Sequence, residues 1–223
     1  SFIIRSRIKK YLKKFDECWV PDIENKEINL TGIFSYHKAF KNCNVKYVGL
    51  LSQFNDDIIY KSKYDIELLI MLSGPENQRT IFENIIMKEL IKYKIKATLV
   101  RGVKGNDVPK YVENITIYDF VYADMYKHLI INSKYIICRA GYTSIMDLIV
   151  LNKKALLVPT PFHPEQEFLV KRLFKNGYFP YMEQDKFDIL KALKILNNFS
   201  FKEFNSVFKE KVYEKYIYQL DEK

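Results

Sequence analysis

The sequence has no long apolar segment and few cysteines. Its longest apolar runs, residues 68–72 and 148–151, fall far short of the roughly 18 residues that a membrane-spanning helix needs. The three cysteines, Cys18, Cys43 and Cys138, are odd in number and widely spaced, with no CxxC or Cys/His ligand pattern. The sequence therefore predicts a chain that does not cross a membrane, lacks a structural zinc site and resides in a reducing compartment.

Glycine-rich nucleotide-binding signatures are also missing. The 7 glycines form neither a GxxxxGK motif followed by Ser or Thr nor a GxGxxG motif, so P-loop ATPases and dinucleotide dehydrogenases lose their main support. The chain is instead rich in apolar residues. Hydrophobic residues make up 48% of the 223 residues and include 17 Tyr, 16 Phe and 1 Trp. This composition excludes a disordered chain and predicts one large folded domain, or one domain plus part of another.

The net charge of +9 is unevenly distributed along the chain. Residues 1–15 contain six basic residues and no acidic one, so the rest of the chain is nearly balanced and we expect no nucleic-acid partner. Residues 4–15 read as an amphipathic basic helix that either lies on a membrane surface or, as we favour, packs on a part of the protein upstream of Ser1. The chain does not start with methionine, and its first apolar residues precede the basic ones, the reverse of a signal peptide. We therefore expect Ser1 to be the cut end of a longer protein.

From residue 66 onwards, short apolar runs alternate with stretches of helical periodicity. Strands are expected at 66–73, 97–100, 115–117, 135–138 and 155–158, and helices at 77–93, 123–132, 143–151, 165–176 and beyond 185. Two earlier strands are expected at 17–20 and 45–48, a polar linker at 50–64 and a final helix at 201–223. This alternation indicates βαβ units and an α/β fold, a Rossmann-like doubly wound parallel sheet.

Ligands of such sheets bind outside the carboxyl ends of the strands, so three strand-to-helix turns are candidate sites. The first turn contains Ser73, Gly74 and Pro75. Glycine lets the backbone approach a ligand, and the following helix points its free N–H groups toward it, which suits a phosphate. The alternative is an ordinary tight turn with Pro75 at the first helical position.

The second turn follows the strand that ends at Cys138. Ser144 and Asp147 have the spacing of a capping box, so one interpretation is that they only cap the next helix. The other is that Asp147, in the first turn of a helix facing the crevice, accepts two hydrogen bonds from a ribose diol. The sequence pattern alone leaves both interpretations open.

The third turn covers residues 159–167. Three prolines stiffen it, and the polar residues that follow are presented on the first turn of a helix. Such a rigid loop can orient a ligand. The alternative is a plain helix entry, in which Glu165 and Glu167 interact with the helix dipole and His163 is a solvated loop residue.

Taken in order, these turns resemble the C-terminal domain of GT-B glycosyltransferases of family 28, some of whose members glycosylate a lipid-linked intermediate of cell-wall synthesis. The resemblance is good over residues 138–178, where Arg139, Gly141, Asp147 and Gln166 match the family pattern together with a Val-Pro pair at 158–159. It extends loosely over nearly the whole chain.

The resemblance implies a donor site for a nucleotide sugar, a UDP-sugar, in an inverting transfer that needs no metal or other cofactor. Asp147 takes the place of the family's ribose-binding Glu, and Gln166 and Glu167 fall on its donor-sugar contacts. Pro75 replaces a residue that would offer an N–H, so diphosphate binding is expected to depend more on 141–144 and on Arg79 or Arg139. The expected donor-binding residues are Ser73, Gly74, Arg79, Arg139, Gly141, Thr143, Ser144, Asp147, Gln166 and Glu167.

The resemblance also implies an incomplete enzyme, the C-terminal half of a GT-B fold. Residues 1–60 would be the tail of the acceptor domain plus linker, 61–200 the nucleotide-sugar-binding domain, and 201–223 a helix packing toward the acceptor domain. No residue is assigned as catalytic base. The expected acceptor is a glycan or lipid-linked molecule, and the expected location is the cytoplasm, with contact to the inner membrane face if residues 1–15 bind it. Two alternatives are a UDP-sugar epimerase or hydrolase of the same fold, and a nucleotide-sugar-binding subunit that needs a partner chain.

Overall fold

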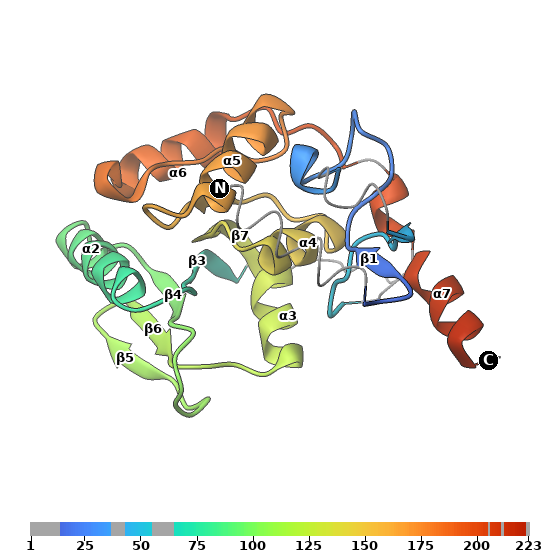
Figure 1. Cartoon of the computed structure of the whole chain (residues 1–223). Coiled ribbons are helices and arrows are strands. Elements are labelled where there is room, and N and C mark those ends of the chain that lie inside the picture. Colours follow the sequence, from blue (N-terminus) through green and yellow to red (C-terminus); the bar gives the residue numbers. More distant parts are fainter. Residues whose placement is uncertain (1–13, 37–42, 55–64, 205, 211, 222–223) are drawn as a thin grey trace. The chain divides into compact units, whose positions relative to one another are not determined.

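The computed structural model describes residues 14–36, 43–54, 65–204, 206–210 and 212–221. The chain divides into two compact units, one formed by residues 1–51 together with 205–223 and the other by residues 52–204 (Figure 1). Most of the expected basic helix at 4–15 and of the expected linker at 50–64 lies outside the described residues. No helix in the described ranges combines the length and apolarity needed to span a bilayer.

The larger unit, residues 52–204, contains a six-stranded sheet in the order β5-β6-β4-β3-β7-β8. The strands are β3 (Ile66–Met71), β4 (Ala97–Val100), β5 (Lys110–Val112), β6 (Ile115–Tyr118), β7 (Ser133–Arg139) and β8 (Leu156–Val158). The helices are α2 (Gln78–Lys92), α3 (Ala123–Asn132), α4 (Tyr142–Val150), α5 (Pro164–Lys175) and α6 (Ile189–Asn198), with a 3-10 turn, η3, at Gln184–Lys186. All pairings are parallel except that of β5 with β6, so the predicted doubly wound parallel sheet is confirmed.

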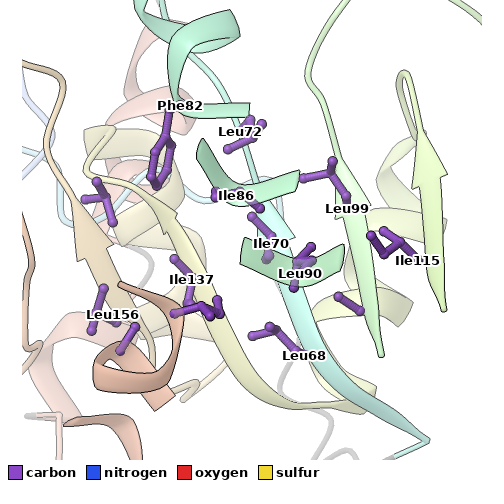
Figure 2. Packing of buried hydrophobic residues seen from close by; sticks show 14 of the residues in the cluster. Leu68, Ile70, Leu72, Phe82, Ile86, Leu90, Leu99, Ile115, Ile137 and Leu156 are labelled. Carbon is purple, nitrogen blue, oxygen red and sulfur yellow. The ribbon is translucent and has the colours of Figure 1, made fainter. Parts of the chain in front are cut away.

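The two faces of this sheet carry alternate residues of each strand, as the pleat requires. On one face Leu68 and Ile70 of β3 pack with Ile137 of β7 against the buried stripe of α2, Phe82, Ile86 and Leu90 (Figure 2). The residues of α6 that join this cluster are Ile189, Ala192 and Leu196. Helix α3 packs instead on β3 and β7, and its buried residues are outside that cluster. The sheet is thus buried on both faces, which explains why β3 is an almost continuous apolar run.

The smaller unit is built from both ends of the chain. Strands β1 (Cys18–Val20) and β2 (Val45–Tyr47) lie where the sequence predicts strands, and they pair in parallel. The 3-10 turns η1 (Gly32–Phe34) and η4 (Ser206–Lys209) and helix α7 (Val212–Asp221) complete the unit. The buried Asp22 carboxylate accepts hydrogen bonds from the backbone N–H groups of Ile23, Leu30 and Thr31, and it thereby fixes the loop between the strands. The ring of Trp19 lies 6.0 Å from that of Tyr216 in α7.

The expected continuous helix at 201–223 is wrong. Helix α6 ends at Asn198, and residues 199–204 form no helix before the short turn η4 and α7. Aromatic packing explains the break, because Phe199 lies against Phe174 and Phe204 contacts both Tyr178 and Phe179 at ring distances of 5.4–5.8 Å. The apolar spacing that suggests one helical stripe belongs to three separate segments.

Candidate functional site

The three candidate turns meet at one edge of the sheet. They follow β3, β7 and β8, which are hydrogen-bonded neighbours running in parallel, so their carboxyl ends lie together. The chain runs outward from β3 through β4 to β6 and then returns to the other side of β3 with β7. The strand order therefore reverses between β3 and β7, and such a switch point is where ligands of doubly wound sheets bind.

The turn after β3 lies beside the loop after β8. Gly74 has φ of +105°, which favours glycine, and a Cβ placed on it would lie 3.6 Å from Thr160 Oγ1. That hydroxyl is buried and has no hydrogen-bond partner among the described residues. The alternative interpretation of this turn places Pro75 at the first helical position. It is wrong, because α2 begins at Gln78. The turn thus presents backbone next to an unpartnered hydroxyl.

Arg79, expected at the diphosphate, is already engaged by carboxylates. It lies buried in the first turn of α2, 2.6 Å from Glu76 and 2.5 Å from Glu83. Glu83 also accepts from Arg101, which in turn pairs with Asp119 at 2.7 Å. A phosphate could recruit Arg79 only by replacing these carboxylates. Arg79 thus joins the turn before α2 to the helix, while Glu83 and Arg101 connect α2 to the loops that follow β4 and β6.

Arg139 is a buried cation without a carboxylate partner in the described part of the chain. It is 1% exposed and lies 4.3 Å from the centre of the Phe82 ring. Its guanidinium donates to the Gln78 carbonyl at 2.8 Å, the Gln184 side chain at 2.5 Å and the Pro159 carbonyl at 3.4 Å. Burial lowers the pKa of the guanidinium to about 10, so it stays protonated at neutral pH. Arg139 therefore connects the end of β7 to the start of α2 and to the loop after β8. It also places a buried positive charge, without a carboxylate partner among the described residues, next to the turns after β7 and β8.

Asp147 lies in the second turn of α4, so both interpretations of its position need correction. Gly141 is the N-terminal cap residue, with no side-chain cap, and Ser144 and Asp147 are the third and sixth residues of the helix. The capping box is wrong because the helix begins two residues before Ser144 and leaves it no capping position. Gly141 has no side chain, so the N-terminal cap residue of α4 gives the helix start no side-chain hydrogen bond.

The Asp147 carboxylate is instead held by the segment that was expected to be linker. Asp147 is only 4% exposed. Its Oδ1 accepts from Ser52 Oγ at 2.6 Å and from the Gln53 backbone N–H at 3.3 Å, and its Oδ2 accepts from Gln53 Nε2 at 2.9 Å. Sequence reasoning missed Ser52 and Gln53, because nothing in a polar stretch 94 or 95 residues away indicates this contact.

The third turn is braced by its own polar side chains. The Thr160 N–H donates to Gln166 Oε1 at 2.8 Å, and the Gln166 N–H donates to His163 Nδ1 at 3.4 Å. His163 is thus the N-terminal cap of α5, which corrects the expectation of a solvated loop residue. Gln166 and Glu167 are half-buried in the first turn of α5, and the Gln166 amide nitrogen makes no hydrogen bond to a described residue. That nitrogen can donate to a ligand.

A fourth loop at the same edge was not predicted as part of the site. It follows β6 and carries Phe120 and Tyr122, which are exposed and pack edge to face with ring centres 5.2 Å apart. Exposed aromatic rings at such an edge can stack on a nucleobase. The sequence does place two aromatic residues within five positions after a strand end. The alternation of apolar and polar residues alone does not distinguish such exposed rings from core residues.

The loop after β8 contains one strained residue. Phe162 has φ of 62° and is 92% exposed. The left-handed conformation costs a non-glycine residue about 1–2 kcal/mol. Replacement by glycine removes this strain, but glycine has a larger entropy in the unfolded state, which reduces the gain in stability by about 0.5–1 kcal/mol. We expect Phe162→Gly to raise the melting temperature by roughly 2 °C in calorimetry. Phe162→Ala is the control, because it removes the ring but keeps the strain. A Gly variant that melts no higher than the Ala variant would contradict the argument.

Solved structures with the same arrangement are glycosyltransferases. The glycotransferase of kitacinnamycin has a TM-score of 0.54 at 10% identity and covers 93% of this chain and 55% of its own. The calicheamicin glycosyltransferase CalG4 has a TM-score of 0.51 at 13% identity, covering 83% and 46%, and the spinosyn forosaminyltransferase SpnP has 0.50 at 11%, covering 81% and 50%. The fold is that of a GT-B glycosyltransferase.

The family follows from the sequence. Residues 83–211, more than half of the chain, match the glycosyltransferase family 28 C-terminal domain, and the chain belongs to this family. A curated relative is the UDP-N-acetylglucosamine--N-acetylmuramyl-(pentapeptide) pyrophosphoryl-undecaprenol N-acetylglucosamine transferase of Sulfurihydrogenibium sp. (strain YO3AOP1), 27% identical over 167 residues. That match covers 74% of this chain and 47% of the relative, so the chain spans about half the relative's length. The resemblance noted from the three turns is confirmed.

Proposed function

We propose that residues 52–204 bind the nucleotide-sugar donor, a UDP-sugar, of a glycosyltransferase. The observation that carries the proposal is the convergence of the Gly74 turn and the uncapped start of α4 at the switch point, with the uncompensated Arg139 behind them. The positive end of a helix dipole and a buried cation together attract a diphosphate. The uridine identity and the sugar class are supported by the name of the curated relative.

Each remaining part of the donor has a matching group at this edge. The diphosphate is placed at Ser73 and Gly74 and at the start of α4, from Gly141 to Ser144. The uracil is placed at Phe120 and Tyr122, and the ribose at Asp147. The sugar is placed at Gln166 and Glu167, where the first-turn amide nitrogen of Gln166 can donate to a hydroxyl. Arg79 and Arg139 act by holding the turns and by their charge.

For the reaction we propose an inverting transfer in which the acceptor attacks the anomeric carbon and UDP leaves. The bond to the diphosphate breaks, and negative charge accumulates on the departing oxygen. The N-terminus of α4 and Arg139 are preorganised positive groups that stabilise this charge, so residues of this chain can do what a divalent metal does in other transferases. We place the catalytic base and the acceptor outside residues 52–204.

We further propose that the acceptor is lipid-linked and that the protein meets it at the cytoplasmic face of a membrane. The name of the relative includes a pyrophosphoryl-undecaprenol acceptor, and residues 1–15 carry six basic residues. The smaller unit, which joins residues 1–51 to 205–223, is proposed to belong to the acceptor side of the enzyme. Residues 205–223, which are most of the expected 201–223 segment, would then be part of the same side.

The first prediction is that this chain binds UDP but transfers no sugar by itself. In calorimetry UDP should bind at least about tenfold more tightly than UMP, because the second phosphate adds contacts with the turns worth at least roughly 1.4 kcal/mol. The absence of UDP binding at millimolar concentration would overturn the proposed function. Steady glycosyl transfer by the chain alone would contradict the placement of the catalytic base outside it.

A further inference from the structure

The carboxylate proposed to bind ribose is covered by its own chain. Ser52 and Gln53 donate three hydrogen bonds to Asp147, which is buried although it lies in the helix that starts at the ligand edge. The Gln53 side chain, which closes over Oδ2, is exposed to solvent. The Oδ2 atom of the buried Asp147 is therefore hydrogen-bonded to an exposed amide.

The two residues of this cover differ in how firmly they are held. Ser52 Oγ, besides donating to Asp147, accepts the Phe54 N–H at 3.0 Å. Phe54 is buried and stacks on Tyr126 of α3 with ring centres 5.8 Å apart. Among the described residues, the Gln53 side chain has no hydrogen bond other than the 2.9 Å bond to Asp147. Of the three donors, the Gln53 amide is the one that can leave at least cost.

Counting hydrogen bonds shows that one of them must leave. A carboxylate offers about four acceptor positions, and three donors already use Asp147. A ribose diol brings two more donors, which exceeds the positions available. A deoxyribose, with a single hydroxyl, fits the remaining position without displacing anything.

We propose that Gln53 is a displaceable cap on Asp147, which the ribose diol of the nucleotide replaces on binding. This inference rests on the proposed function, in which Asp147 is the ribose-binding residue. Gln53 therefore sets the affinity for ribonucleotides by competing with them, and it reduces the preference for ribose over deoxyribose. Binding also frees the side chain of Gln53, the second residue of the larger unit.

The test compares UDP and 2′-deoxy-UDP on the whole 223-residue chain by calorimetry, with melting curves for each variant. Gln53→Ala is expected to bind UDP about three- to tenfold more tightly than wild type, since no hydrogen bond to a charged group has to be broken first. Its affinity for 2′-deoxy-UDP should change less than twofold. Asn198→Ala, which removes an exposed amide at the end of α6, is the matched control and should change neither.

The sign of the Gln53→Ala effect decides the inference. Weaker UDP binding would mean that Gln53 positions Asp147 rather than capping it, and unchanged binding would mean that it does neither; both outcomes overturn the proposal. An equal gain for 2′-deoxy-UDP would overturn it as well. Failure of the proposed function would show in different measurements. The wild type would bind no UDP, or the Asp147→Asn variant would keep the UDP affinity of the wild type.

Discussion

Asp147→Asn is expected to weaken UDP binding at least about tenfold in a protein that remains folded. Hydrogen bonds from ribose hydroxyls to a charged group are worth roughly 1.5–3 kcal/mol each, and about 1.4 kcal/mol corresponds to tenfold in affinity. Asparagine keeps the size of the side chain and one acceptor oxygen for Ser52. Calorimetry with UDP, accompanied by melting curves, measures both quantities.

Asp147→Ala should lose the same affinity and also stability. It leaves the donors of Ser52 and Gln53 without their acceptor, which costs about 2 kcal/mol when water replaces it only partly. The control is Asp107→Asn, at an exposed loop position. Wild type should also prefer UDP to 2′-deoxy-UDP, and both Asp147 variants should lose much of that preference. Unchanged UDP affinity in folded Asp147→Asn would remove Asp147 from the site.

Gly102→Ala is expected to have the largest effect on stability, about 3 kcal/mol. Gly102 has φ of +67°, and a Cβ on it would lie 2.4 Å from the Leu72 carbonyl oxygen. The left-handed conformation costs about 1–2 kcal/mol and forced overpacking about 1–3 kcal/mol more. The melting temperature should fall by roughly 6–12 °C. Because the clash displaces the backbone just before Ser73 and Gly74, UDP affinity should fall as well.

Gly141→Ala provides the comparison for Gly102. Gly141 has φ of −71°, and a Cβ on it would lie no closer than 3.8 Å to its nearest neighbour, Ser144 Oγ. Its melting temperature should stay within about 2 °C of wild type. If the melting temperature fell by the same amount in both variants, the close approach of the Leu72 carbonyl would not be the reason why position 102 requires glycine.

The sequence predicts those parts of the fold that depend on local pattern. The apolar run of β3 and the stripe of Phe82, Ile86 and Leu90 in α2 reflect burial by direct neighbours, and both elements lie where expected. Strand β5 was missed because its residues are all exposed at the sheet edge and show no alternation. The break after Asn198 was missed because it depends on aromatic partners elsewhere in the chain.

The sequence predicts where the candidate site lies, but it does not predict the contacts of its charged side chains. Turns containing Gly74 and Gly141 follow from glycine at strand ends, and the topology brings them together. The environment of a charged side chain depends on distant residues, so the sequence could not show that Arg79 is engaged by Glu76 and Glu83. For the same reason it could not show that Asp147 is covered.

The discontinuity of the smaller unit bears on how the protein is made. Residues 52–204 form an uninterrupted segment of chain, whereas the smaller unit needs residues 1–51 and 205–223 together. Domains generally fold as units as the chain leaves the ribosome. Residues 52–204 can therefore complete their sheet during translation, while β1 and β2 wait for α7, whose Tyr216 ring lies 6.0 Å from that of Trp19, until residues 205–223 have been made. During that interval Trp19 lacks its Tyr216 neighbour, so the smaller unit stays incomplete after the sheet of the larger unit has formed.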